Sequence, residues 1–148
     1  MTAALPSVTL VRRIKASPAR VWAAITRPDQ MLRWWGPDAG PTLDVDADVR
    51  PGGRFSVTFR LVDGSEHTPT GVYREVEPET RLSFTWDLPQ AQEPPSLVTF
   101  RLAPIDGGDG TELTLTHEHL PDAATRASHE AGWTGLLDKL PLFLGDAA

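Results

Sequence analysis

The sequence predicts a single α+β domain in which a curved antiparallel sheet is covered by a long C-terminal helix. Three observations lead to this fold class. Between residues 42 and 119, apolar and polar residues alternate over six segments, as they do in strands with one buried face. Turn sequences such as "RPGG", "EPET" and "PIDGGDG" separate these segments. Residues 121–145 repeat instead with the period of an α-helix. A chain of 148 residues suits one core, so we expect one domain over residues 1–148.

The elements are predicted in the order β-α-α-β6-α. A first strand is expected over residues 8–14. The helix over 17–26 has Ser17 as its N-cap and Pro18 at its first helical position, where the missing N–H has no consequence. A second helix is expected over 28–36. The six strands are expected near residues 42–47, 53–62, 69–76, 81–87, 96–103 and 111–119, and the terminal helix over 122–144.

Alternation assigns apolar side chains to one face of the sheet. They are Phe55, Val57, Phe59 and Leu61; Leu82, Phe84 and Trp86; Val98, Phe100 and Leu102; Leu113 and Leu115. The helical arc that should cover them comprises His129, Trp133, Leu136, Leu137, Leu140, Phe143 and Leu144. Ala131, Gly132 and Gly135 are interpreted as small residues beside Trp133 that let the helix approach the sheet. Pro141 is expected to kink or interrupt its last turn. Tyr73 and Val76 cannot both face inward in a regular strand, so a bulge or an early strand end is expected there.

Four stretches of the sequence carry a resemblance to a protein family. They are "RRIKASPARVWAAITRPDQMLRWWGP" (12–37), "PGGRFSVTF" (51–59), "GVYREVEPETRLSFTW" (71–86) and "HEAGWTGLLDKL" (129–140). Together the chain resembles the helix-grip fold of the START/Bet v-like (SRPBCC) superfamily, in the branch named for similarity to the activator of heat-shock protein 90 ATPase. The resemblance covers about residues 8–144. It implies a cavity between sheet and helix that usually receives an apolar molecule. It implies no shared chemistry, because members include binding proteins, cyclase-like enzymes and chaperone activators.

Composition excludes several functional classes. Twenty acidic residues against fourteen basic ones give a net charge of -6, and the basic residues are dispersed, so no nucleic acid is expected as a partner. No apolar run approaches the ~20 residues of a membrane span, and the N-terminus lacks a secretory signal, so a cytoplasmic location is expected. The absence of cysteine excludes thiolate chemistry. No glycine-rich phosphate or dinucleotide motif is present, and no cofactor is expected.

Three of the four histidines lie within "THEHLPDAATRASHEAGW" (116–133). Alternation places His117 and His119 in the inward row of their strand, with Cα atoms roughly 6.5–7 Å apart, and His129 lies in the apolar arc of the helix. The trio could form a metal site, an acid/base cluster or the polar rim of a hydrophobic container. We expect the third arrangement and no bound metal, because the sequence assures no complete ligand set.

The aromatic residues that face the helix favour a container for a small molecule. The candidate ligand-binding residues are Phe55, Phe59, Tyr73, Trp86, Phe100, His117, His119, His129 and Trp133. The first hypothesis is a binding protein for a small hydrophobic or amphipathic ligand. The alternatives are an enzyme of cyclase, dehydratase or hydrolase type that uses a cavity histidine as its base, and a chaperone-associated module suggested by the family name. No catalytic residue is assigned, and self-association as a homodimer stays open.

Overall fold

The computed structural model describes residues 7–34, 42–60, 63–87, 96–120 and 122–144. The chain forms, in order, β1 (Val8–Ile14), α1 (Pro18–Thr26), α2 (Pro28–Trp34), β2 (Thr42–Ala47), β3 (Arg54–Arg60), β4 (Glu66–His67), β5 (Thr70–Glu77), β6 (Arg81–Trp86), β7 (Ser96–Ile105), a 3₁₀ turn (Asp106–Gly108), β8 (Gly110–Glu118) and α3 (Ala123–Phe143). Leu61 of the predicted inner row and residues 35–36 of the predicted second helix lie outside the described residues.

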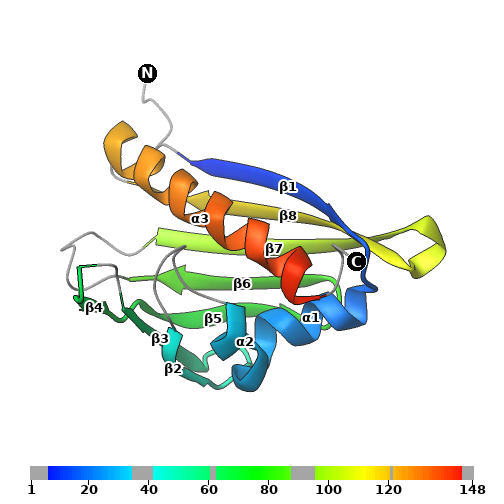
Figure 1. The fold of residues 1–148 in the computed structure, drawn as a ribbon, viewed down its shortest axis with the longest axis horizontal. Coiled ribbons are helices and arrows are strands. Elements are labelled where there is room, and N and C mark those ends of the chain that lie inside the picture. The colour runs from blue at the N-terminus through cyan, green and yellow to red at the C-terminus, as the bar shows by residue number, and fades with distance from the viewer. Residues whose placement is uncertain (1–6, 35–41, 61–62, 88–95, 121, 145–148) are drawn as a thin grey trace.

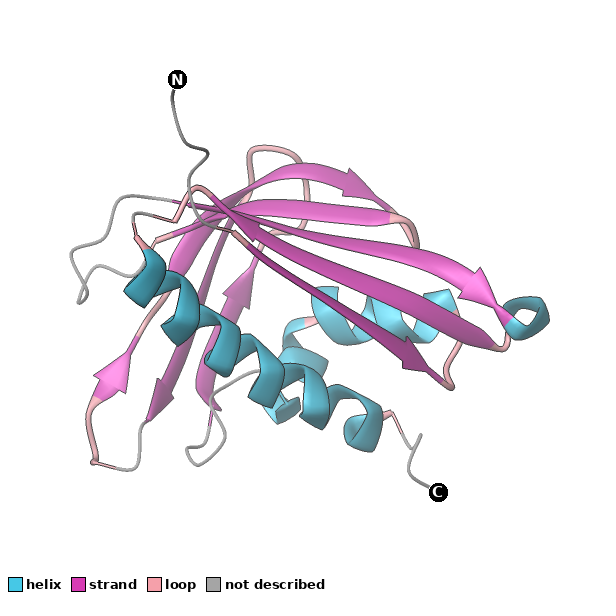
Figure 2. Ribbon diagram, turned by 90° about the horizontal axis from the view of Figure 1, so that it is seen from above, coloured by secondary structure: helices cyan, strands magenta, loops and turns pink. Residues whose placement is uncertain are grey.

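Seven strands form one antiparallel path in the order β1-β8-β7-β6-β5-β3-β2, and β4 pairs with β3. The sheet is strongly curved, and α3 lies across its concave face (Figures 1 and 2). This arrangement is the predicted helix-grip fold, so the fold class is confirmed. The one addition is β4, whose two residues lie in a segment expected to be a turn, because a polar pair is too short to show alternation.

The two short helices stand at one end of the sheet (Figure 1). The predicted cap of α1 is confirmed, since the hydroxyl of Ser17 accepts a hydrogen bond from the Arg20 N–H at 3.3 Å. Trp34 of α2 is buried, and its indole N–H donates to the Ala24 carbonyl at 2.9 Å. This bond fastens α2 to α1.

Helix α3 begins at a side-chain cap, because the carboxylate of Asp122 accepts the Thr125 N–H at 2.7 Å. Its buried side chains follow the predicted arc: Trp133, Leu136, Leu137 and Leu140. The far end is tied to α1, where the Arg20 guanidinium donates to the Leu144 carbonyl at 2.5 Å. Helix α3 is therefore packed on the sheet from Trp133 to Leu140 and tied to α1 at its C-terminal end.

Two expectations about α3 are wrong in part. Ala131 and Gly132 are exposed, and a Cβ added to Gly132 would meet no atom within 4 Å, so these small residues do not mediate close approach to the sheet. Pro141 does not interrupt the helix, which continues to Phe143, and the expected kink stays a prediction. The lost bond lies in the last turn, where a helix end already lacks partners for its final carbonyls.

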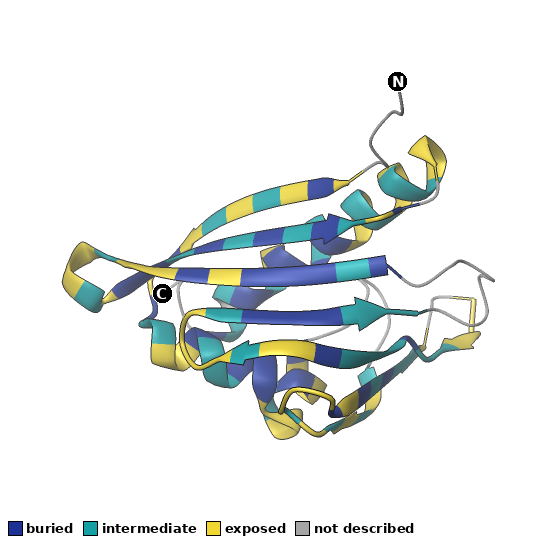
Figure 3. Ribbon diagram, turned by 180° about the vertical axis from the view of Figure 1, so that it is seen from behind, coloured by how far each residue is buried: buried dark blue, intermediate teal, exposed yellow. Residues whose placement is uncertain are grey.

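The bulge predicted in β5 is confirmed. The pairing of β5 with β6 shifts register between Tyr73 and Glu75. Tyr73 is 2% exposed and packs edge-on against Phe84, with ring centroids 6.0 Å apart, whereas Arg74 and Glu75 face solvent. The extra residue lets Tyr73 face inward although Val76 is also turned towards the core. Seen from behind, β1 and β8 alternate buried with more exposed positions, whereas the middles of β6 and β7 are buried without interruption (Figure 3).

Candidate functional site

Four aromatic side chains meet where the C-terminal ends of β6 and β8 approach α3. This ring cluster consists of Trp86 from β6, His117 from β8, and His129 and Trp133 from α3. The ring centroids lie 4.7 Å apart for His117–His129, 5.3 Å for Trp86–Trp133, 6.0 Å for Trp86–His117 and His117–Trp133, and 6.5 Å for Trp86–His129. His117 and Trp133 are 0% and 4% exposed, while Trp86 and His129 are only partly buried.

His117 is the fixed centre of the ring cluster. The indole N–H of Trp133 donates to His117 Nδ1 at 2.9 Å. Since a neutral imidazole has one acceptor nitrogen, the proton lies on Nε2, which donates to the Ser96 hydroxyl at 2.6 Å. The Ser96 hydroxyl is then free to donate to the Trp86 carbonyl at 3.4 Å. The geometry thus assigns one tautomer and one direction to this chain of hydrogen bonds.

The environment keeps His117 neutral. Burial, and secondarily the nearby His129, lower the pKa of His117 from its ordinary 6.5 to about 3. The hydrogen bonds agree with this direction, because a protonated Nδ1 would point a second N–H at the indole donor of Trp133. His117 therefore has no free lone pair and is a poor proton acceptor near pH 7. In this arrangement it positions its neighbours and does not supply a general base.

Trp86 differs from His117, because its side-chain nitrogen is unpaired. Its Nε1 is a buried side-chain nitrogen without a hydrogen-bond partner among the described residues. Its ring nevertheless lies edge-on to both imidazoles and 5.3 Å from the Trp133 ring. An unpaired buried donor costs about 1–3 kcal/mol, and no acceptor among the described residues offsets that cost.

A second aromatic group lies deeper on the same face. Phe55, Tyr73, Phe84 and Phe100 are buried, with centroids 4.9 Å apart for Phe55–Phe84 and 6.0 Å for Phe84–Phe100. Phe100 joins this group to the ring cluster through an edge contact with Trp133 at 6.1 Å. Burial, and then the charge of Asp48, raise the pKa of the Tyr73 hydroxyl, which stays protonated. These side chains form an apolar wall between sheet and helix.

Phe59 is partly buried near the end of β3 and stacks on His67 of β4, with ring centroids 6.0 Å apart. The two residues are register partners across the β3–β4 pair. The remaining histidine of the sequence thus belongs to the rim near Phe59 and lies outside the ring cluster.

The inward orientation predicted for His119 is wrong. Strand β8 ends at Glu118, and His119 has φ 66, in the left-handed region. This turn breaks the alternation: His119 is exposed, and Leu120 is fully buried instead. The predicted trio of His117, His119 and His129 is consequently not formed. Within the described part of the chain, no three His, Asp or Glu side chains gather where they could hold a metal ion.

Sequence reasoning missed Ser96 as the partner of His117. Ser96 is 6% exposed and begins β7, in the same inward row as Val98 and Phe100. Strand β7 also runs beside β8, with Val98 opposite His117. Extending the alternation by one step to Ser96 would have indicated a hydroxyl at this level of the sheet.

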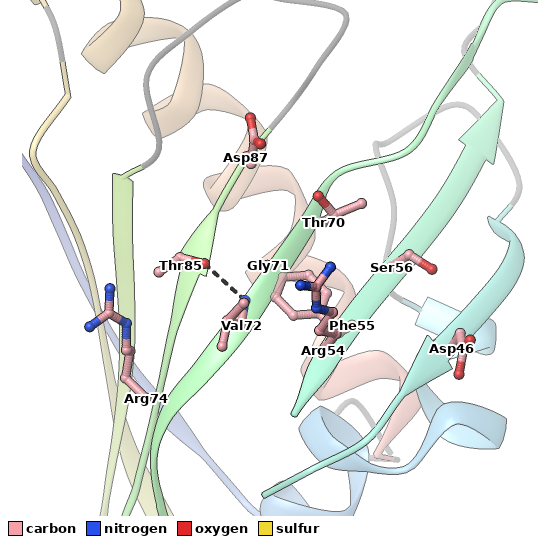
Figure 4. Close-up of a pocket in the computed structure, with 10 residues that line it drawn as sticks. All are labelled: Asp46, Arg54, Phe55, Ser56, Thr70, Gly71, Val72, Arg74, Thr85 and Asp87. Carbon is pink, nitrogen blue, oxygen red and sulfur yellow. Dashed lines mark hydrogen bonds between the residues drawn. The ribbon is translucent and has the colours of Figure 1, made fainter. Parts of the chain in front are cut away.

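The convex face carries two depressions. The larger, of about 580 Å³, is lined by Asp46, Arg54, Phe55, Ser56, Thr70, Gly71, Val72, Arg74, Thr85 and Asp87 (Figure 4). Across it the Val72 N–H donates to the Thr85 hydroxyl at 2.8 Å. The smaller, of about 400 Å³, shares Arg74 and Thr85 and includes His119. Two arginines and two aspartates line the larger one, so their charges balance and attract neither sign of ion.

Comparison with protein families matches residues 15–145 to the family described as Activator of Hsp90 ATPase homolog 1-like protein. The chain belongs to this family. The match spans nearly the whole described fold, from the end of β1 to the last turn of α3. A comparison with curated proteins finds no match. No described helix combines the length and the apolar character needed to cross a membrane.

Solved structures share the fold. Protein CV1439 from Chromobacterium violaceum is 28% identical with a TM-score of 0.83, over 92% of this chain and 94% of that one. CalU16 from Micromonospora echinospora is 29% identical with a TM-score of 0.73, over 93% of this chain and 74% of that one. The AHSA1 protein from Silicibacter pomeroyi is 24% identical with a TM-score of 0.81, over 95% of this chain and 98% of that one. Family membership supports a ligand-binding type of domain and leaves the ligand open.

Proposed function

We propose that this protein binds a small, largely apolar molecule in a cavity between the concave face of the sheet and α3. The observation that carries the proposal is the partly buried pair Trp86 and His129, which stands beside the fully packed wall of His117 and Trp133. Aromatic surface left partly open at a seam between sheet and helix gains free energy when an apolar ligand covers it, at about 25 cal/mol per Å². A few polar groups beside it fix the orientation of the ligand.

Binding is favoured over catalysis by the state of His117. A histidine base needs an accessible lone pair and a pKa near the working pH. The Nδ1 lone pair of His117 accepts the Trp133 indole, and the pKa of the imidazole lies at about 3. The hydrogen-bond partners of His117 are Ser96 and Trp133, so no carboxylate directs it as an acid–base pair would require. We therefore assign His117, Trp133 and Phe100 to the wall of the site.

A ligand panel tests the proposal. Fatty acids, flavonoids and polyketide-like aromatics are added to the protein, and the melting temperature and tryptophan fluorescence are recorded. A ligand at 100 times its Kd should stabilise the native state by about 2.7 kcal/mol and raise the melting temperature by several degrees. Binding should also change the fluorescence of Trp86, which lies at the open edge of the ring cluster.

Two variants locate the site. Phe100→Trp enlarges a fully buried wall residue that contacts Trp133, so it should fill the cavity and weaken binding. His119→Gln is the matched control, because His119 is exposed on the convex side and its replacement should leave affinity unchanged. If no member of the panel shifts either signal, the container function is refuted. The chaperone-associated alternative, which would use the outer surface, would then be the better-supported function.

A further inference from the structure

We infer that the ligand presents a neutral hydrogen-bond acceptor, such as a ketone, ester or amide oxygen, to the indole N–H of Trp86. The inference rests on the proposed function and names the chemical class of the ligand. Trp86 Nε1 is buried and has no partner among the described residues. The other indole of the ring cluster is paired, since Trp133 donates to His117. Trp133 therefore forms part of the wall of the site, and the indole N–H of Trp86 is the donor that recognises the ligand.

The donor character of Trp86 restricts the ligand. An indole nitrogen donates one hydrogen bond and accepts none, so a ligand group with only donors leaves it unpaired. A hydrocarbon also leaves the indole N–H unpaired. A ligand oxygen accepts its hydrogen bond and so removes the free-energy cost of the unpaired donor. The acceptor nitrogen of His117 does not serve the Trp86 indole, because Nδ1 already accepts the Trp133 N–H. The Ser96 hydroxyl pairs with His117 Nε2, and Trp86 Nε1 forms no hydrogen bond with any described residue.

A neutral acceptor fits better than a carboxylate. His117 keeps both nitrogens in hydrogen bonds as the neutral tautomer, and the indoles carry no charge. Bringing an ionised carboxylate against these rings would remove its hydration without supplying a fixed cation. The Nε1 atom is shielded from solvent, so binding includes a small displacement of the groups that cover it. A carbonyl oxygen tolerates that dry setting at lower cost than a charged oxygen does.

Three probes of similar shape test the inference: 2-acetylnaphthalene with a neutral acceptor, 2-isopropenylnaphthalene without one, and 2-naphthoate with a charged acceptor. Equilibrium dialysis gives the Kd of each for the unmodified protein and for Trp86→Phe, which keeps an aromatic ring and removes the N–H. Trp133→Phe is the matched control, because it makes the same chemical change at a nitrogen already bonded within the protein. Circular dichroism checks that all three chains are folded.

The unmodified protein should bind 2-acetylnaphthalene roughly fivefold more tightly than 2-isopropenylnaphthalene, the ratio expected for one hydrogen bond. In Trp86→Phe this ratio should fall to about one, and in Trp133→Phe it should persist even if both affinities change. Equal binding of the two probes to the unmodified protein overturns the inference and leaves the proposed function intact. Tighter binding of 2-naphthoate than of 2-acetylnaphthalene overturns the inference that the acceptor is neutral. If no probe binds, the proposed function itself fails.

Discussion

Replacing His117 by Gln should remove much of the acid sensitivity of the fold. In the native state His117 is fully buried and its pKa is about 3, whereas the unfolded chain has the ordinary value of 6.5. Between these values the unfolded chain binds more protons, so the free energy of unfolding falls as the pH falls. The contribution is fully present above about pH 6.5 and is lost progressively towards pH 3. The whole difference corresponds to about 5 kcal/mol.

The measurable window lies between pH 7.5 and 5. Over this range the linkage relation gives a loss of about 2 kcal/mol from His117 alone. Gln offers one donor and one acceptor in place of the Ser96 and Trp133 contacts but does not titrate. His117→Gln should therefore be less stable than the unmodified protein at pH 7.5, and the gap should narrow by about 2 kcal/mol at pH 5.

Urea unfolding followed by circular dichroism at several pH values measures this gap. The control is His119→Gln, which makes the same substitution at an exposed histidine. If His117→Gln keeps the full pH dependence, the acid sensitivity arises elsewhere and the assignment of a buried, neutral His117 is refuted. Nitrogen chemical shifts of the imidazole provide a second check, because they should report a proton on Nε2 at pH 7.

Three further substitutions test the packing. Gly132→Ala should stabilise the protein by up to about 1 kcal/mol, because the position is helical, exposed and open to a Cβ; a lower melting temperature would contradict this. Gly71→Ala should strongly destabilise it, because the added Cβ would collide with the Thr85 carbonyl oxygen and the Phe55 ring; an unchanged urea midpoint would show that the strands can separate there. Ser17→Ala should cost about 1 kcal/mol through the lost cap of α1, and Ser17→Thr should recover most of it in the same urea assay.

Periodicity predicted the fold well because the core of this protein depends on it. The inward rows of β6, β7 and β8 contain Phe84, Phe100 and Leu115, all buried as alternation required. The arc of α3 was equally readable, since Trp133 and Leu137 are buried against those rows. Steric necessity also revealed the bulge after Tyr73, where two inward residues stand at an irregular spacing. These features follow from local rules that each strand or helix obeys on its own.

The candidate site was less predictable because it depends on positions at which the alternation of a strand ends. His119 is one residue past the end of β8, and a single left-handed φ turns it away from the inner face. No pattern in "THEHL" indicates that turn. Glycine would predict a left-handed conformation, whereas histidine can adopt one without predicting it. The hydrogen bonds of His117 also could not be predicted from alternation alone. They join β7, β8 and α3, and they depend on side-chain directions that alternation does not specify.

The contrast between Trp86 and Trp133 shows why the ring cluster suits recognition. Both indoles lie on the inner face, at a centroid separation of 5.3 Å. The single acceptor nitrogen of His117 can satisfy one indole, and α3 presents Trp133 to it. Trp86 is then left with a rigid ring and an unpaired donor beside a partly exposed His129. A fixed wall next to one unsatisfied donor is poorly suited to moving protons, and it is well suited to selecting an apolar molecule that carries one acceptor.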